Sequence, residues 1–205
     1  LFRQHGHTVR LIAPKFVTPY RMSGKRGKND AADAAAICEA VTRPHMRFVP
    51  IKEEHQQNIL CIHRTRQGFI EERTATYNRL RGLIAEFGIV LPQKVERLRS
   101  DIHSHLESMP GWLNRCVTDL LAHADHLDTL IEEYDRAIKT IAKEDERSKR
   151  LMQLPGIGPT TASALLASLG VGHDFDNGRQ VAAWMGLTPG QYSSGGKTRL
   201  GRITK

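Results

Sequence analysis

Two long stretches of the chain carry hydrophobic residues at helical spacing. In residues 51–87 they recur three, four or seven positions apart, at Ile59, Ile62, Phe69, Ile70, Tyr77, Leu80, Leu83, Ile84 and Phe87. A second series comprises Val117, Leu120, Leu121, Ala124, Leu127, Ile131, Tyr134, Ile138 and Ile141. Such spacing places the apolar side chains on one face of a helix. The pattern therefore predicts two unusually long helices, with Gly88 as the glycine that ends the first.

These two helices are expected to pair antiparallel, either within one chain or across a dimer. Pro92, Pro110 and Gly111 break the chain between them. The residues between the apolar positions are strongly charged and would be poorly buried, which favours a coiled-coil linker. An ordinary helical bundle is the alternative.

The pattern before residue 51 is different. The apolar run at residues 9–13 predicts a buried strand, and residues 21–28 form a loop with two glycines and four cations. Asn29 or Asp30 then caps an Ala-rich helix over residues 31–41, and an extended segment follows at residues 48–50. This order of elements indicates a piece of an α/β domain.

Beyond a charged hinge at residues 144–150, the sequence predicts a compact helical segment at residues 151–187 and a terminus rich in Gly, Ser and Lys. The whole is predicted to be mainly α. We expect three parts: an α/β piece at residues 1–50, a coiled-coil linker or dimerisation region at residues 51–145, and an incomplete C-terminal domain at residues 146–205.

Charge points to the class of partner. The 205 residues carry a formal net charge of +8, with 40% hydrophobic and 25% charged residues, as in a folded protein with a polyanionic partner. The three cysteines are far apart and form no Cys-x-x-Cys pair, which argues against a zinc site and a disulfide framework. No apolar run approaches the ~20 residues that cross a bilayer. We therefore expect a cytoplasmic, nucleoid-associated protein without a membrane partner.

The first motif with possible chemistry is Lys28-Asn29-Asp30-Ala31-Ala32-Asp33. Asp30 and Asp33 are three residues apart, so their carboxylates share one face of the helix. Such oxygen ligands suit Mg²⁺, and paired metals can assist phosphodiester cleavage. Acidic residues are also common in a first helical turn for capping alone. The nearby cations Lys25, Arg26 and Lys28 favour the metal interpretation, because they would hold phosphates beside the carboxylates.

The second motif is Leu154-Pro155-Gly156-Ile157-Gly158-Pro159, followed by a helix of small residues. It resembles the helix-hairpin-helix element of DNA-binding proteins. The N–H groups around Gly156 and Gly158 could bind a phosphate without reading bases. A purely structural turn between two packed helices is the alternative.

The third motif places Ser193 and Ser194 in a glycine-rich loop flanked by the cations Lys197, Arg199, Arg202 and Lys205. A serine can attack a phosphodiester if its hydroxyl is activated and cations neutralise the developing charge. Without other information, a flexible basic tail with ordinary loop serines explains the same residues.

Taken together, these motifs resemble the insertion-sequence transposases that have an N-terminal DEDD domain of the RuvC type and a C-terminal domain with a nucleophilic serine. Members are guided by a structured RNA of the element, the bridge RNA. The resemblance runs along essentially the whole chain, through residues 7–19, 28–34, 47–52, 81–88, 154–159 and 186–205. It implies a DNA transposase that cleaves and rejoins strands, with an α/β RuvC-like (RNase H-type) remnant at its N-terminus.

The resemblance also implies individual roles. Asp30 and Asp33 match the last two acidic residues of the DEDD set, which hold Mg²⁺, and Ser194 best matches the nucleophile, with Ser193 as the second choice. The basic loop and the turn at Gly156 and Gly158 would face DNA or guide RNA. One subunit's carboxylates would meet another's serine, so a dimer or tetramer is implied.

Two departures from the family's pattern qualify this expectation. The first Asp and the Glu of the DEDD set have no match in the chain, and the family continues past Lys205, so we expect a sequence truncated at both ends. The alternatives are a catalytically dead transposase piece that only binds DNA or RNA, and a coiled-coil scaffold whose charge is incidental.

Overall fold

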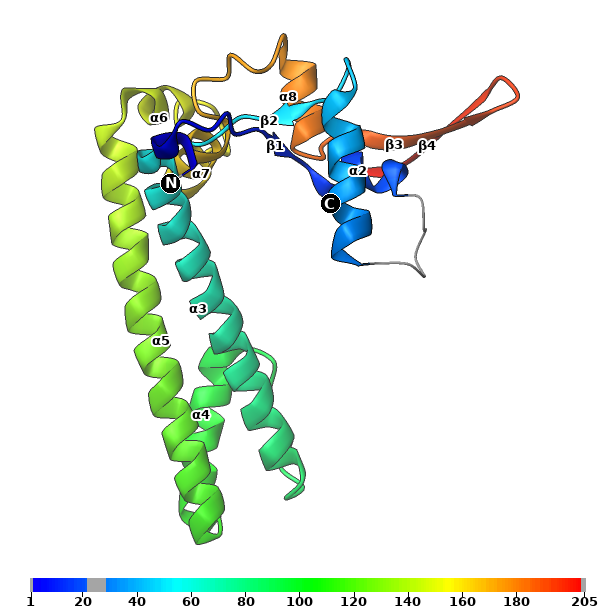
Figure 1. Ribbon diagram of the computed structural model, residues 1–205. Coiled ribbons are helices and arrows are strands. Elements are labelled where there is room, and N and C mark those ends of the chain that lie inside the picture. Colours follow the sequence, from blue (N-terminus) through cyan, green and yellow to red (C-terminus); the bar gives the residue numbers. More distant parts are fainter. Residues whose placement is uncertain (1, 22–28, 204–205) are drawn as a thin grey trace. The chain divides into compact units, whose positions relative to one another are not determined.

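The computed structural model describes residues 2–21 and 29–203 and is mainly helical, with two short pairs of strands (Figure 1). Residues Glu53–Val171 form one compact unit, and the residues up to Lys52 with those from Gly172 onward form a second. In chain order the elements are η1 (Phe2–His5), β1 (Leu11–Ile12), α1 (Pro14–Val17), η2 (Thr18–Tyr20), α2 (Asp30–Thr42), β2 (Phe48–Val49), α3 (Glu54–Ala85), α4 (Val95–His105), η3 (Leu106–Ser108), α5 (Gly111–Glu144), α6 (Glu146–Leu151), α7 (Pro159–Leu169), α8 (Gly178–Trp184), β3 (Pro189–Ser194) and β4 (Lys197–Ile203).

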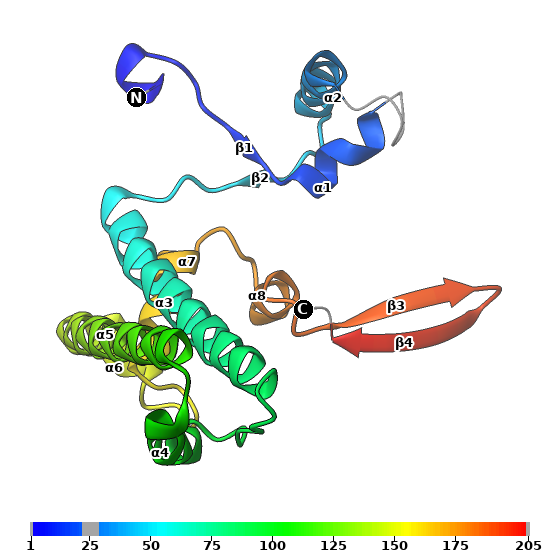
Figure 2. The same ribbon diagram turned by 90° about the horizontal axis from the view of Figure 1, so that it is seen from below.

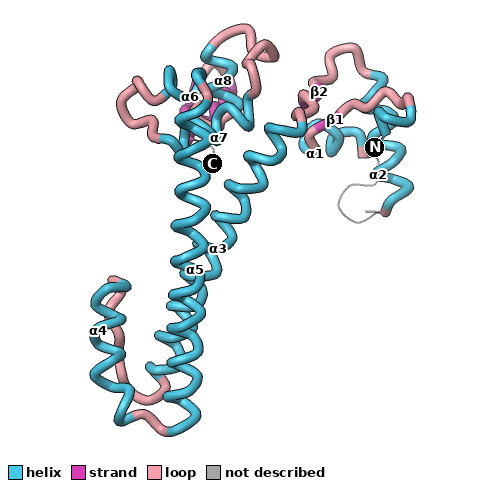
Figure 3. The backbone as a smooth tube through the Cα atoms, turned by 90° about the vertical axis from the view of Figure 1, so that its left-hand side faces the viewer, coloured by secondary structure: helices cyan, strands magenta, loops and turns pink. Residues whose placement is uncertain are grey.

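Helices α3 and α5 form a long antiparallel pair, which we call the arm (Figures 1 and 3). All nine apolar positions of the second predicted series are at least partly buried, because they face α3 or the elements packed beside it. The prediction of two long helices that pair antiparallel is confirmed, and the pairing occurs within one chain. Within the described ranges, no helix combines the length and the apolar character that crossing a membrane requires.

Gly88 ends the first long helix as predicted. Its φ of 79° lies in the left-handed region that glycine adopts without strain. The N–H of Gly88 donates to the carbonyl of Ala85, and the N–H of Ile89 donates to that of Ile84 at 3.4 Å. Ile84 is fully buried, and Ile89 packs against the same cluster. This pair of hydrogen bonds with an apolar contact is a Schellman motif.

The break predicted between the long helices contains a helix, α4, which the sequence analysis missed (Figure 3). Leu98 and Ile102 of α4 are fully buried, and they belong to the same core cluster as Tyr77 and Leu80 of α3. The apolar face of α4 comprises only Val95, Leu98 and Ile102, a series much shorter than those of the long helices. Pro92 and Pro110 lie outside this helix and do not interrupt it.

Helices α6 and α7 complete the first unit at the other end of the arm. Helix α7 packs against both α3 and α5. The side chain of Gln56 is 8% exposed, accepts a hydrogen bond from the N–H of Glu53 at 2.9 Å, and lies against Gly170 at the end of α7. The start of α3 is therefore tied to the end of α7.

In the N-terminal segment, β1 and β2 pair antiparallel over two residues each, with Leu11 opposite Val49 and Ile12 opposite Phe48. The predicted cap of the following helix is confirmed, since the side chain of Asn29 accepts a hydrogen bond from the N–H of Ala32 at 2.7 Å. The elements appear in the predicted order of strand, helix and strand.

The C-terminal segment differs from the prediction of a helical domain ending in a loop. Residues 189–203 form an antiparallel β-hairpin, β3–β4 (Figure 2). Gly195 and Gly196 connect its strands with φ values of 55° and 76°. Two consecutive positive φ angles define the type I′ turn, whose twist matches that of the flanking strands. Ser193 and Ser194 therefore lie on a strand.

Candidate catalytic and nucleic-acid-binding sites

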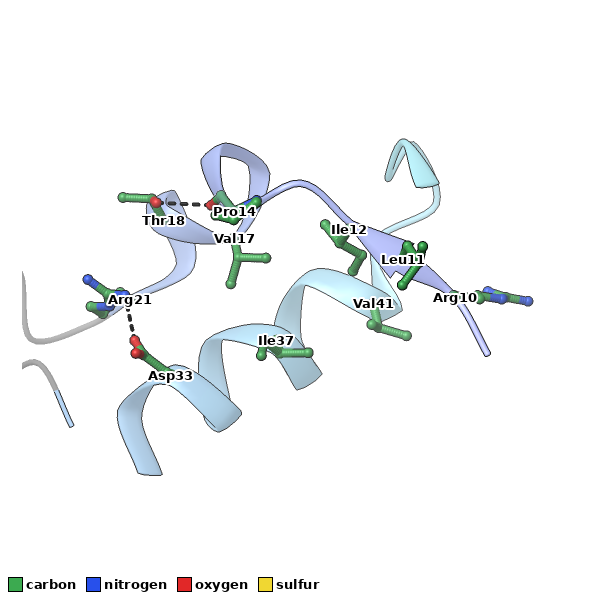
Figure 4. Close-up of a pocket in the computed structure, with 10 residues that line it drawn as sticks. All are labelled: Arg10, Leu11, Ile12, Pro14, Val17, Thr18, Arg21, Asp33, Ile37 and Val41. Carbon is green, nitrogen blue, oxygen red and sulfur yellow. Dashed lines mark hydrogen bonds and ion pairs between the residues drawn. The ribbon is translucent and has the colours of Figure 1, made fainter. Parts of the chain in front are cut away.

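The two candidate metal-binding carboxylates lie in the first turn of α2 and differ in their surroundings. Asp30 is exposed, whereas Asp33 is partly buried and faces a cavity of about 360 Å³ beside β1 and α1 (Figure 4). The Nη2 atom of Arg21 lies 2.5 Å from Oδ1 of Asp33. Among the described residues, this buried oxygen accepts no hydrogen bond of good geometry, so charge alone holds the pair.

These donor atoms suit Mg²⁺ in kind but not in number. An under-coordinated buried carboxylate oxygen is a suitable ligand for a hard cation. The cation of Arg21 already neutralises Asp33, however, and within residues 2–21 and 29–203 no three His, Cys, Asp or Glu side chains gather as a metal site would require. Asp30 and Asp33 can thus supply part of a metal site, and the described residues alone do not complete it.

The second candidate site is the turn between α6 and α7. Gly156 has a φ of 86°, a value open to glycine without strain, and the N–H of Ile157 donates to the carbonyl of Leu154 at 3.1 Å. Gly158 is the N-cap of α7, and Pro159 occupies the first turn of that helix. The first N–H groups of a helix have no partner inside it and can hold an anion. The backbone geometry therefore agrees with the phosphate-binding interpretation of the motif.

A partly buried polar contact joins α7 to α3 of the arm. Nε2 of His63 lies 2.9 Å from the hydroxyl of Ser163, which in turn donates to the carbonyl of Thr160 at 3.3 Å. Burial, with a smaller effect of the Arg66 charge, lowers the pKa of His63 and favours its neutral form. A neutral imidazole with its proton on Nε2 can donate to Ser163. This contact links α7, which follows the turn, to α3.

The third candidate site is the face of the β3–β4 hairpin that carries Ser194. Alternate residues of a strand share a face, and paired residues of neighbouring strands share it too. Ser194 is paired with Lys197, and Tyr192 is paired with Arg199. All four side chains are exposed. We call this set the basic face of the hairpin.

Ser193 lies on the opposite face. It is paired with Thr198, and its hydroxyl accepts a hydrogen bond from Nε2 of Gln191 at 2.8 Å. Arg202 lies beyond Leu200, where a register shift interrupts the strict alternation of side chains along β4. The two candidate nucleophiles therefore lie on opposite faces of the hairpin, and Ser194 shares its face with Lys197 and Arg199.

Some predicted residues lie outside the described ranges, namely Lys25, Arg26 and Lys28 of the basic loop, and Lys205. Two other residues were missed. Arg21 pairs with Asp33, and no sequence signal identifies such a pair across twelve positions. Tyr192 could have been found, because a Gly-Gly pair between two short extended runs is a hairpin signal that places Tyr192 and Ser194 on one face.

Two protein-family models match this chain, one in its N-terminal part and one in its C-terminal part. A model described as "Transposase IS116/IS110/IS902 family" matches residues 148–205. A second model, the DEDD type of IS110 transposases, described as "Transposase", matches residues 1–89. The two matches include α2 with its carboxylates, the turn before α7 and the hairpin.

Curated relatives match nearly the whole chain. A probable family 20 transposase of Pseudomonas aeruginosa is 42% identical over 99% of this chain and 61% of its own length. The transposase for insertion sequence element IS1328 of Yersinia enterocolitica is 41% identical over 98% of this chain and 60% of its own length. The transposase for IS1111A of Coxiella burnetii is 36% identical over all of this chain and 56% of its own length. The chain thus spans about three fifths of the length of these relatives.

Proposed function

Because this chain belongs to the IS116/IS110/IS902 family of transposases, we propose that it takes part in cleaving and rejoining DNA strands when an insertion sequence moves. The observation that carries the proposal is the position of Ser194. Its hydroxyl lies on the basic face of the β3–β4 hairpin, within the segment that matches the family. Ser193, the alternative nucleophile, faces away from Lys197 and Arg199.

The chemistry proposed for Ser194 is attack on a DNA phosphodiester. The serine oxygen forms a bond to phosphorus, and the bond from phosphorus to one sugar oxygen breaks. The hydroxyl loses its proton, and the leaving sugar oxygen gains one. Lys197 and Arg199 stabilise the negative charge that builds up on the phosphate oxygens. Reversal of this step with another strand end rejoins DNA.

We also propose that Asp30 and Asp33 are two of the carboxylates that hold Mg²⁺. The shared helix face supports this role, as does the buried Oδ1 of Asp33, which is ion-paired with Arg21 but accepts no hydrogen bond among the described residues. The remaining ligands would be other carboxylates. Among the described residues, no such group lies together with Asp30 and Asp33. A bound divalent ion would supply Lewis-acid activation of a phosphate oxygen. Replacement of Asp30 by Asn should then abolish Mg²⁺-dependent cleavage, and undiminished cleavage would leave Asp30 as an acidic first-turn residue that complements the helix dipole.

The turn at Gly156 and Gly158 is proposed as a contact to the nucleic-acid backbone that carries no sequence information. Its support is the free N–H geometry at the start of α7 and the formal net charge of +8. Sequence would then be read by other means, and guide RNA pairing is our proposal for that role. Enrichment of one structured RNA on the purified protein would support it, and equal binding to unrelated RNAs would contradict it.

Self-association of the arm is proposed as well. Large apolar side chains remain exposed where α3 ends and α5 begins, with Val90 at 89%, Trp112 at 84% and Phe87 at 54% exposure. Trp and Phe are enriched where protein surfaces meet. A dimer or tetramer would allow carboxylates of one subunit to act with the serine of another.

The decisive experiment is the capture of a covalent protein–DNA complex. It uses a protein that contains this chain together with the further length seen in its relatives, and a DNA that carries the element ends. We expect the Ser194→Ala variant to bind this DNA but form no covalent complex on a denaturing gel. The Ser193→Ala variant is the matched control and should form it normally.

The alternative function is a nucleic-acid-binding module without catalysis. Its support is the incomplete carboxylate set among the described residues, together with the exposed cations of the hairpin. This alternative predicts salt-sensitive binding and no covalent complex with any variant. A covalent complex that persists in the Ser194→Ala variant would instead exclude Ser194 as the nucleophile.

A further inference from the structure

Tyr192 has an unusual position for a large aromatic residue. Its side chain is 76% exposed, although it lies in the middle of a strand. It precedes Ser194 by two residues on the same face and is paired with Arg199. An aromatic ring and two cations thus share one face of the hairpin with the proposed nucleophile.

The ring of Tyr192 lies close to a glycine of the neighbouring strand. A Cβ atom added to Gly201 would lie 3.4 Å from a ring carbon of Tyr192, and 3.2 Å from the carbonyl oxygen of Gly190. The ring edge therefore lies beside Gly201, within van der Waals reach of a Cβ at that position. One side of the ring contacts the strand, and the exposure of the residue leaves the ring open to a ligand.

From this geometry we propose that Tyr192 stacks against an unpaired DNA base next to the phosphodiester that Ser194 attacks. The inference rests on the proposed function and adds a positioning residue to it. Bases have flat faces that stack on aromatic rings whatever their sequence, while neighbouring cations hold the phosphates. The basic face supplies both kinds of contact, with Tyr192 for the base and Lys197 and Arg199 for the backbone.

The geometry favours a single strand over a duplex. Bases in a duplex are already stacked on their neighbours and offer only their edges in the grooves. An exposed aromatic ring can offer its face to an unpaired base, whose own face is free. Removal of one stacking residue typically weakens single-strand binding about tenfold or more.

The test compares the binding of fluorescein-labelled DNA oligonucleotides to the 205-residue chain and its variants by fluorescence anisotropy. The variants are Tyr192→Phe, which keeps the ring, and Tyr192→Leu, which keeps apolar bulk without it. Leu200→Ala is the matched control, since Leu200 is 69% exposed on the opposite face of the hairpin. A 2-aminopurine base in a second set of oligonucleotides reports stacking directly through quenching of its fluorescence.

We expect Tyr192→Leu to weaken single-stranded DNA binding about tenfold and to abolish the quenching, while Tyr192→Phe and Leu200→Ala change neither. Duplex binding should be the same in all variants. Unchanged single-strand affinity of Tyr192→Leu would overturn the inference, as would equal losses in Tyr192→Phe and Tyr192→Leu. Tighter binding of an RNA strand of the same sequence would also overturn it.

The outcomes separate this inference from the proposed function. Normal covalent capture by Ser194 in a Tyr192→Leu protein, with unchanged DNA affinity, would remove only the stacking role. Loss of quenching in Tyr192→Leu, combined with no covalent complex in the parent protein, would retain the stacking role and remove Ser194 as the nucleophile.

Discussion

Two neighbouring residues of α4 allow a comparison of apolar burial with ion pairing in the arm. Leu98 is fully buried among residues of α3 such as Tyr77 and Leu80. Replacement of a buried Leu by Ala removes transfer free energy and leaves a cavity, at a typical cost of 2–5 kcal/mol. The site lies between α3 and α4 and cannot collapse fully, so we expect Leu98→Ala to lower the free energy of unfolding by about 3 kcal/mol.

Arg99 makes more contacts but should contribute less. Its guanidinium donates to the hydroxyl of Tyr77 at 2.8 Å, to Asp128 at 2.9 Å and to Asp125. The Arg99 side chain is 33% exposed, so solvent screens these charges. Asp128 would still keep its ion pair with Arg73 at 2.6 Å, and Asp125 is exposed to water. We therefore expect Arg99→Ala to cost about 1–2 kcal/mol.

Urea denaturation followed by circular dichroism at 222 nm would measure both variants. Arg97→Ala is the matched control, because it removes a cation from an exposed position of the same helix and should change little. The Arg99→Ala loss should shrink in 1 M salt, whereas the Leu98→Ala loss should not. A larger loss for Arg99→Ala than for Leu98→Ala, or a salt-independent one, would refute the argument that burial dominates the stability of the arm.

Two further predictions concern helix ends, at the start of α6 and the end of α7. Hydrogen bonds from the side chain of Arg147, and from the N–H groups of Arg147 and Ser148, lower the pKa of Asp145 to about 2. Because the unfolded carboxyl titrates near 3.8, this stabilisation is complete above that pH and is lost as the pH falls towards 2. Asp145→Asn should therefore cost about 1–2 kcal/mol at pH 7, and unfolding curves of variant and parent should converge near pH 2. Gly170→Ala should cost about 1–3 kcal/mol, because its φ is 66° and the added Cβ would lie 3.0 Å from Nε2 of Gln56. Gly68→Ala within α3 meets nothing within 4 Å and should instead stabilise the chain by about 0.5–1 kcal/mol, and urea denaturation would measure both glycine variants. Equal effects of the two glycine changes would contradict this account.

The long helices could be predicted because α3 carries eight, and α5 nine, apolar positions at helical spacing. Series of this length show the helical period clearly. The end of α3 could also be predicted, since Gly88 is the residue that a left-handed helix end favours. Helix α4 was missed because its apolar face is short and consists of Val95, Leu98 and Ile102. Its stability comes from contacts with Tyr77 and Leu80, which lie about twenty residues earlier in the chain. Such contacts depend on the tertiary fold and leave no local pattern.

The hairpin was missed for a different reason, which bears on the choice of nucleophile. Its residues are rich in Gly and Ser, a composition typical of loops, and its burial pattern gives no alternation because every residue of β4 is exposed. Only the Gly195-Gly196 turn signalled two paired strands. In a loop, Ser193 and Ser194 are equivalent, and only resemblance favours one of them. In a strand, adjacent side chains point to opposite faces. Lys197 and Arg199 therefore lie on the same face as Ser194 and on the opposite face from Ser193.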